Sequence, residues 1–109
     1  MARARSYELT GPLAELILPQ ITIGTLFLGV EGIDAQGAYA QHEGEAAVGA
    51  AFVRCARRVV VVTDHTKLGE AAFALICRAD RIDAVLTDSG AAPEQVEPLR
   101  RAGIEVITV

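Results

Sequence analysis

The residues best suited to chemistry follow one another in the sequence Asp64-His65-Thr66-Lys67, which offers a carboxylate, an imidazole, a hydroxyl and an ammonium. They come directly after four valines, residues 59–62, the pattern of a strand buried on both faces of a parallel sheet. Open α/β sheets bind their ligands at the carboxyl ends of such strands. Lys67 is suited there to a phosphate or a carboxylate, as a point charge close to backbone amides. We therefore expect a ligand site at this strand end.

Two further predicted strands also end in acids. Residues 23–30 lead into Glu31 and Asp34, and residues 84–87 lead into Asp88. Because the carboxyl ends of parallel strands share one edge of the sheet, these acids and Asp64 are expected to converge on one crevice. Aspartate is also common after strands as a cap of turns and helices, and capping alone explains each acid taken singly. Both interpretations stay open at this point.

Other catalytic constellations are missing from the sequence. It contains no P-loop, no GxGxxG and no Ser-His-Asp arrangement with elbow glycines. Neither His42 nor His65 has a second ligand at metal-binding spacing, so we expect no metal. Cys55 and Cys77 lie in apolar segments without a CxxC motif and are expected to be buried thiols.

Composition narrows the function classes. The 109 residues are 51% apolar, which suits a single domain with an ordinary core. The net charge of -4 and the dispersed arginines argue against a nucleic-acid-binding face, because phosphate contacts need clustered cations. With no signal peptide and no apolar run long enough to span a bilayer, we expect a cytoplasmic protein without membrane contacts.

The elements that must position these residues alternate along the chain. Apolar runs predict strands at residues 23–30, 59–62, 84–87 and 104–109, and periodic patterns predict helices at 13–18, 43–58, 70–77 and 93–102. In helix 43–58 the apolar repeat is Val48, Ala51, Phe52 and Cys55. The alternation predicts a three-layer α/β fold, with a mostly parallel, Rossmann-like sheet, right-handed crossovers and helices on both faces.

Six blocks of the chain, in order, carry a resemblance to a known family. Between about Tyr7 and Val109 the chain resembles the later part of the C-terminal effector domain of DeoR-family bacterial transcription regulators. The matching blocks are 11–15, 27–34 with Gly37, 45–48, 63–69, 82–88 and 102–106. The resemblance implies that residues 1–109 form one sugar-phosphate-sensing domain, which controls a separate helix-turn-helix. The helix-turn-helix and the opening of the sensor domain, with its phosphate-cradling loop, are expected to be absent from this chain.

That domain is similar in turn to ribose-5-phosphate isomerase. The enzyme's Asp-Gly-Ala-Asp motif resembles residues 31–34, its catalytic glutamate resembles Glu45, and its Asp-x-Ser-Lys motif resembles residues 64–67. The resemblance implies that a phosphorylated sugar contacts six residues: Glu31, Gly32, Asp34, Glu45, Asp64 and Lys67.

Two departures argue against isomerase chemistry. The segment that carries a catalytic lysine in the enzyme is reduced here to residues 35–44, which contain no lysine. The first acid is glutamate, which moves its carboxylate by about one methylene in a geometry that tolerates little misplacement. We therefore expect a non-catalytic sensor that needs no cofactor and reaches DNA only through the missing helix-turn-helix. The alternatives are a phosphosugar aldose-ketose isomerase and a ligand-free oligomerisation module.

Self-association is the last expectation. Strands that are apolar on both faces need partners along their edges, and an open edge with Val and Ile side chains pairs readily with another chain. We expect a homodimer or higher oligomer, joined by edge pairing or by the helix face of Val48, Phe52 and Cys55.

Overall fold

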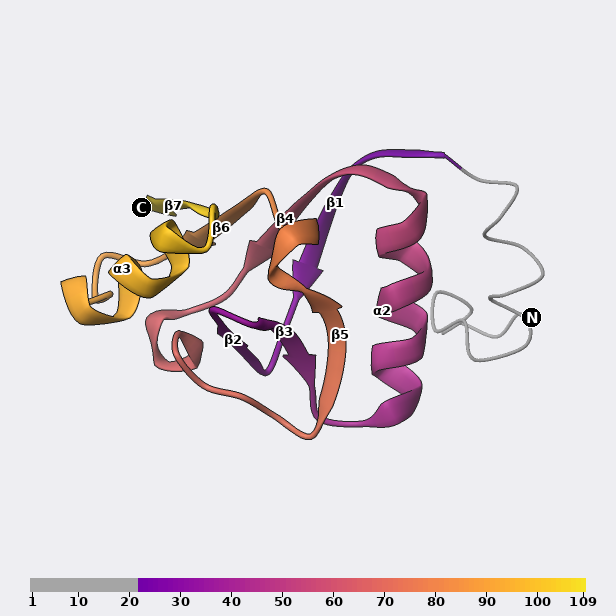
Figure 1. Ribbon diagram of the computed structural model, residues 1–109, viewed down its shortest axis with the longest axis horizontal. Coiled ribbons are helices and arrows are strands. Elements are labelled where there is room, and N and C mark those ends of the chain that lie inside the picture. The colour runs from indigo at the N-terminus through magenta and orange to yellow at the C-terminus, as the bar shows by residue number, and fades with distance from the viewer. Residues whose placement is uncertain (1–21) are drawn as a thin grey trace.

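A parallel sheet forms the centre of the molecule. The computed structural model describes residues 22–109, and its larger sheet has the order β1-β4-β6-β7 with every pair parallel (Figure 1). The strands are β1 (Ile23–Gly29), β4 (Ala56–Val62), β6 (Ala84–Thr87) and β7 (Glu105–Thr108). The α/β class and the mostly parallel sheet are confirmed. β1, the predicted strand 23–30, stands at one end of the strand order among the described residues and is only partly buried, although its almost uniformly apolar sequence indicates a central strand.

A second, antiparallel sheet was not predicted. It contains β2 (Gly32–Asp34), β3 (Gly37–Ala40) and β5 (Ala74–Arg78) in the order β2-β3-β5. The prediction of a helix at 70–77 is wrong, because its second half belongs to β5, which pairs with β3 over Gly37–Ala40, and its first half is neither helix nor strand. A helical pattern over eight residues is a weak signal, and pairing with a distant strand overrides it.

The helices are shorter than the patterns indicated. α2 (Glu43–Cys55) ends three residues before the predicted boundary, because Ala56 is already extended and pairs with Ile23 in the larger sheet. α3 (Pro93–Arg101) accommodates Pro98 and is followed by Gly103 with φ +91°. Two short 3-10 helices complete the helices of residues 22–109, η2 (His65–Lys67) and η3 (Ala79–Arg81).

The buried face of α2 also differs from the predicted face. Ala46, Gly49 and Val53 are buried against the smaller sheet and β1, and a Cβ at Gly49 would lie 2.9 Å from Cγ2 of Ile76. The predicted residues Val48, Phe52 and Cys55 are only partly buried; Phe52 and Cys55 pack on Ala51 in a separate cluster. The buried face of α2 consists mainly of small residues, and a search for large apolar residues overlooks them.

One face of the larger sheet carries the core. The core joins this face to α2, to the smaller sheet and to α3, and its members include Val53, Ile33, Ile76, Val59, Val61, Val85, Leu99 and Val106. Both described helices therefore lie on the same side of the sheet, whereas helices on both faces were expected. The predicted helix at 13–18 lies outside the described residues.

Within residues 22–109, no helix is long and apolar enough to cross a membrane.

Candidate functional site

The carboxyl end of β4 leads into η2 through Asp64. The Asp64 carboxylate accepts the Thr66 backbone N–H at 2.8 Å and also the Thr66 hydroxyl, and it caps η2. The hydrogen bond from the Thr66 hydroxyl is the main cause that lowers the pKa of Asp64, and the Thr66 amide adds to it. Asp64 therefore carries its negative charge over the whole physiological pH range.

Asp88 reaches from the end of β6 to the same turn. Its Oδ2 accepts the His65 backbone N–H at 3.1 Å, and its Oδ1 lies 2.8 Å from His65 Nδ1. The backbone bonds from His65 and then from Gly90 lower the pKa of Asp88. A Cβ at Gly90 would lie 2.7 Å from the His65 ring, so this turn has little space for a side chain. As predicted, the acids that follow β4 and β6 lie close together.

Gln95 ties the turn to α3. Its side-chain Nε2 donates to the His65 carbonyl at 2.9 Å, and its Oε1 accepts the Ala92 N–H at 2.8 Å. Sequence reasoning placed His65 in the chemistry-bearing run 64–67 but not among the ligand contacts, and it missed Gln95. A lone glutamine thirty residues away gives no motif, and only the fold brings it to His65.

Lys67 links the ends of β1 and β4. Its Nζ lies 3.5 Å from Oε1 of Glu31, and both side chains are partly exposed. The backbone supports this contact, since Gly69 donates to the Ile33 carbonyl at 2.7 Å and Ile33 bridges Leu68. A side chain at Gly32 would collide with the carbonyl of Glu70, so Gly32 allows two chain segments to approach closely.

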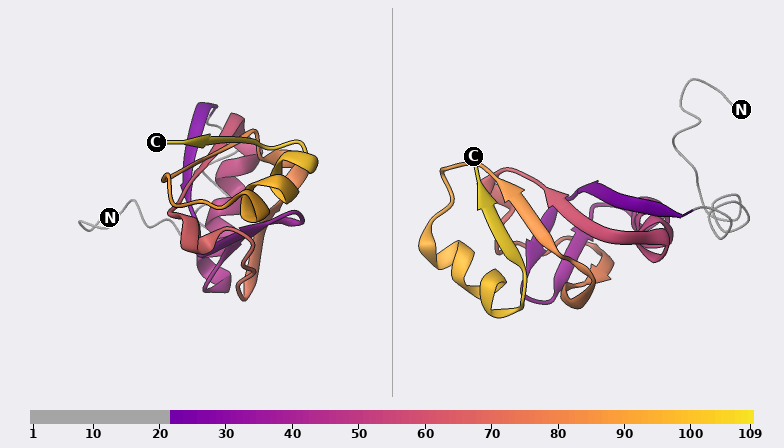
Figure 2. Two further views of the ribbon diagram at one scale, coloured as in Figure 1. Left: turned by 90° about the vertical axis from the view of Figure 1, so that its left-hand side faces the viewer. Right: turned by 90° about the horizontal axis from the view of Figure 1, so that it is seen from above.

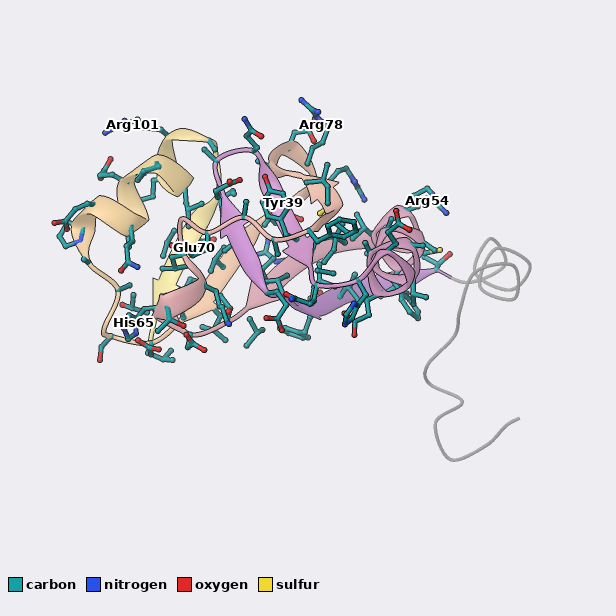
Figure 3. All side chains as sticks on the ribbon, turned by 90° about the horizontal axis from the view of Figure 1, so that it is seen from below. Tyr39, Arg54, His65, Glu70, Arg78 and Arg101 are labelled. Carbon is teal, nitrogen blue, oxygen red and sulfur yellow. The ribbon has the colours of Figure 1, made fainter. Side chains whose placement is uncertain are left out.

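Asp34 does not join these residues in the structure. Its Oδ1 accepts the N–H groups of Gln36 and Gly37 at 2.9 and 3.2 Å and the Tyr39 hydroxyl at 3.1 Å, which holds the β2–β3 turn. Burial, followed by the bond to Asp34, raises the pKa of Tyr39. Figure 3 shows Tyr39 well away from His65, and Asp34 with it.

Glu45 also stands apart. It lies in the first turn of α2 with an exposed side chain. In the part of the chain that the structure describes, no hydrogen bond or ion pair links Glu45 to Lys67 or to the aspartates. The structure thus unites Glu31, Asp64, Lys67 and Asp88 and leaves Asp34 and Glu45 outside this group.

We call the group Glu31, Asp64, His65, Lys67 and Asp88 the strand-end site. It presents one ammonium and three carboxylates, which suits a ligand with one anionic group and several hydroxyls. Among residues 22–109, no cluster of His, Cys, Asp and Glu has the arrangement of a metal site. A cavity of about 730 Å³ lies elsewhere, beside the β2–β3 turn, and its lining includes Gln36, Tyr39, Leu75, Arg78, Asp80 and Ala102.

The two cysteines take no part in the site. Cys77 is buried in β5, and this burial raises the pKa of its thiol, as expected for an inert core cysteine. Cys55, at the end of α2, is partly buried.

The chain matches one protein-family model and is similar to several transcription regulators. The family model described as the DeoR C-terminal sensor domain matches residues 1–89. A protein of Escherichia coli O157:H7, named as a candidate transcriptional repressor of the aga operon, is 36% identical over 108 residues, which are 98% of this chain and 40% of that protein. The HTH-type transcriptional regulator GlpR of Haloferax volcanii is 32% identical over 106 residues, 96% of this chain and 42% of the regulator.

A third relative covers less of the chain. The HTH-type transcriptional regulator UlaR of Shigella dysenteriae is 31% identical over 84 residues, 77% of this chain and 34% of that regulator. This chain therefore spans about two fifths or less of the length of the curated relatives that it matches.

Proposed function

Because the chain belongs to the DeoR family of transcription regulators, as part of its C-terminal sensor domain, we propose that it binds a phosphorylated sugar at the strand-end site without converting it. The family membership supports effector sensing in general. We propose three finer points: the effector is a phosphosugar, it binds at the strand-end site, and the chain does not convert it.

The ion pair between Lys67 and Glu31 carries the proposal. The two side chains meet at the ends of neighbouring parallel strands, where α/β sheets bind ligands, and both are open enough for a ligand to reach. A phosphate can replace Glu31 as the partner of Lys67 and keep the charge-assisted bond. Such a bond contributes about 1.5–3 kcal/mol to binding.

The aspartates supply the polar contacts to the sugar. Asp64 and Asp88 are ionised acceptors whose backbone hydrogen bonds hold them in place. Each retains acceptor capacity, since a carboxylate offers about four lone-pair positions. Gly32 contributes by letting residues 69–70 close over the end of β2. We include Asp34 and Glu45 among the ligand contacts only because of the family resemblance.

The proposal excludes isomerase chemistry because the lysine that the enzyme carries between its acids and its catalytic glutamate has no counterpart in this chain. No lysine lies between Glu31 and Glu45 in the sequence, and the relatives reported above bear the names of regulators. In a longer regulator, binding of the ligand at the strand-end site would control a helix-turn-helix domain that contacts DNA in the cytoplasm.

Thermal unfolding tests the ligand. We expect phosphorylated pentoses and hexoses to raise the melting temperature of the 109-residue chain, because a ligand at 100 times its Kd stabilises the folded state by about 2.7 kcal/mol. The unphosphorylated sugars serve as controls and should raise it much less. If no phosphosugar shifts the transition more than its sugar does, the proposal fails in favour of a ligand-free module.

Lys67→Ala tests the site. Loss of the phosphate contact should weaken binding by about 10- to 100-fold. The matched control is Arg101→Ala, which removes an exposed cation from an ion pair within α3, far along the chain from the site. Equal effects of the two substitutions would remove Lys67 from the proposed site.

An activity assay separates the sensor from the enzyme. Incubation with ribose 5-phosphate should give no ketose above background. Ketose formation that disappears in Glu45→Gln would establish the isomerase alternative.

A further inference from the structure

The cavity beside the β2–β3 turn has the composition of a ligand pocket. Its volume of about 730 Å³ falls within the range of small-molecule sites, about 300–1,000 Å³. Its apolar walls come from Tyr39, Leu75 and three alanines, residues 35, 79 and 102. Its polar side chains are those of Gln36, Arg78 and Asp80. Mostly apolar walls with a few polar groups are typical of ligand pockets. We call this space the hairpin cavity.

The lining of the hairpin cavity comes from elements that are far apart in the sequence. Residues 35–39 belong to the β2–β3 hairpin, residues 75–80 belong to β5 and η3, and Ala102 follows α3. The right-hand view of Figure 2 shows the smaller sheet and α3 on the same side of the larger sheet. Arg78 lies far from His65 in Figure 3, so the hairpin cavity is separate from the strand-end site.

Hydrogen bonds hold the walls of the cavity in place. The Ala79 N–H donates to the Gln36 carbonyl at 2.9 Å, which joins η3 to the hairpin turn. The Arg81 guanidinium donates to the Val53 carbonyl at 2.6 Å and ties η3 to α2. Tyr39 is only 9% exposed, and its hydroxyl donates to Asp34. The cavity is therefore formed before a ligand arrives, and binding needs to order little of the chain.

Arg78 and Asp80 are the charged groups of the cavity. From residue 22 to the end of the chain, no hydrogen bond or ion pair engages either side chain, and the two do not pair with each other. By contrast, Arg58 and Arg101 pair with glutamates, and Arg81 donates to backbone carbonyls. A free guanidinium is a fork that fits a carboxylate, and a free carboxylate accepts an ammonium.

We propose that the hairpin cavity binds a zwitterionic amino acid with a large apolar side chain. The Arg78 guanidinium takes the carboxylate of the ligand, and the Asp80 carboxylate takes its ammonium. The walls at Tyr39, Leu75 and the alanines remove the apolar side chain from water. A sugar fits this cavity less well, because hydroxyls buried against Leu75 and alanines would lose hydrogen bonds to water without replacement.

L-Tryptophan is the probe for this site, because the chain contains no tryptophan and the emission of the bound ligand has no protein background. Its fluorescence anisotropy should rise on titration with the 109-residue chain. Indole-3-propionate lacks the ammonium, and tryptamine lacks the carboxylate. Each should bind at least about tenfold more weakly than tryptophan, because one charge-assisted contact is missing.

Two substitutions assign the charges. Arg78→Gln should weaken the binding of tryptophan by about tenfold or more, and it should not weaken the binding of tryptamine, which has no carboxylate. Asp80→Asn should weaken tryptophan likewise, and it should not weaken indole-3-propionate, which has no ammonium. Both residues are exposed, so circular dichroism should show that both variants are folded. The matched controls Arg57→Gln and Glu94→Gln remove exposed charges outside the cavity and should leave tryptophan binding unchanged.

Several outcomes would overturn the proposal. Absence of tryptophan binding at millimolar concentration would do so. Equal affinities for the three probes would also do so, because binding would then depend on the indole ring alone. If Arg57→Gln weakens binding as much as Arg78→Gln, the attraction comes from net charge and not from the hairpin cavity. None of these measurements uses a phosphosugar or a residue of the strand-end site, so the result is independent of the function proposed above.

Discussion

The two sheets of this molecule are held together in different ways. In the larger sheet, a Cβ added at Gly24 or Gly29 would meet nothing within 4 Å. Valine side chains fill much of the core on the other face of this sheet. In the smaller sheet, a side chain at Gly37 would collide with the Cys77 carbonyl, and one at Gly32 would collide with Glu70. The larger sheet therefore depends on side-chain packing, and the smaller one depends on the close approach of backbones.

This difference decides which changes each sheet tolerates. A side chain can be accommodated at Gly24 and Gly29 of β1, but not at Gly32 and Gly37 of the β2–β3 hairpin. Conversely, Asp64 caps the turn that follows β4 and Asp88 reaches this turn from the end of β6, whereas Asp34 organises the hairpin through three neighbours. Substitutions matched between the two regions should show large differences in the free energy of unfolding.

The largest effect is expected for Gly37→Ala. The added methyl group would meet the Cys77 carbonyl and lie 3.1 Å from the Cα of Arg78, both of them backbone atoms that cannot rotate away. Overpacking against backbone should destabilise the chain by about 3 kcal/mol. Urea unfolding followed by circular dichroism measures this change.

Gly29→Ala is the matched control, because it adds the same methyl group where nothing lies within 4 Å. Its effect should stay within about 0.5 kcal/mol. Equal effects at Gly29 and Gly37 would contradict the proposed difference between the sheets.

The same contrast explains what the sequence could predict. The four strands of the larger sheet were recognised because each contains a short run of apolar residues. β5 was mistaken for a helix and the smaller sheet was missed, since its pairing joins residues 37–40 to residues 74–78 and leaves no local pattern. The buried face of α2 was missed because alanine and glycine, rather than large residues, form it.

The site was predictable to the extent that it follows a rule about strand ends. Asp64 binds the Thr66 amide and Asp88 binds the His65 amide in the same turn, and Lys67 pairs with Glu31, as the rule about parallel strand ends predicts. Asp34 also follows β1 in the sequence, but β2 carries it away from the strand ends into a hairpin turn. Gln95 could not be found, because only the docking of α3 brings it to His65.

A smaller effect is expected for Asp34→Ala, which removes the acceptor for two backbone amides and the Tyr39 hydroxyl. Because Tyr39 is buried and would lose its partner, the loss should be about 1–2 kcal/mol. Asp34→Asn keeps one carbonyl oxygen and should lose less. Asp80→Ala, an exposed aspartate in η3, is the control and should change stability by less than about 0.5 kcal/mol.

Acid should loosen the turns of the strand-end site. Asp64 and Asp88 have pKa values below the ordinary 3.8, so their contribution to stability is present above pH 3.8 and is lost as the pH falls through the lower folded values. Between pH 5 and pH 2 the free energy of unfolding should fall, and it should fall less in the double variant Asp64→Asn, Asp88→Asn. An unchanged acid dependence in that variant would mean that other carboxylates control it.

The smallest effect on stability is expected at the residue that matters most to the proposed ligand. Lys67 and Glu31 form a single ion pair with side chains that are 35% and 49% exposed, and such pairs contribute about 0–1 kcal/mol. Lys67→Ala should therefore change the free energy of unfolding by less than about 0.5 kcal/mol, and added salt should reduce the difference further. A residue that contributes little to folding but lies where two strands end is available for binding. If urea unfolding instead shows a loss of more than about 2 kcal/mol, Lys67 belongs to the scaffold, like Gly37, and its weakened ligand binding would only report a damaged fold.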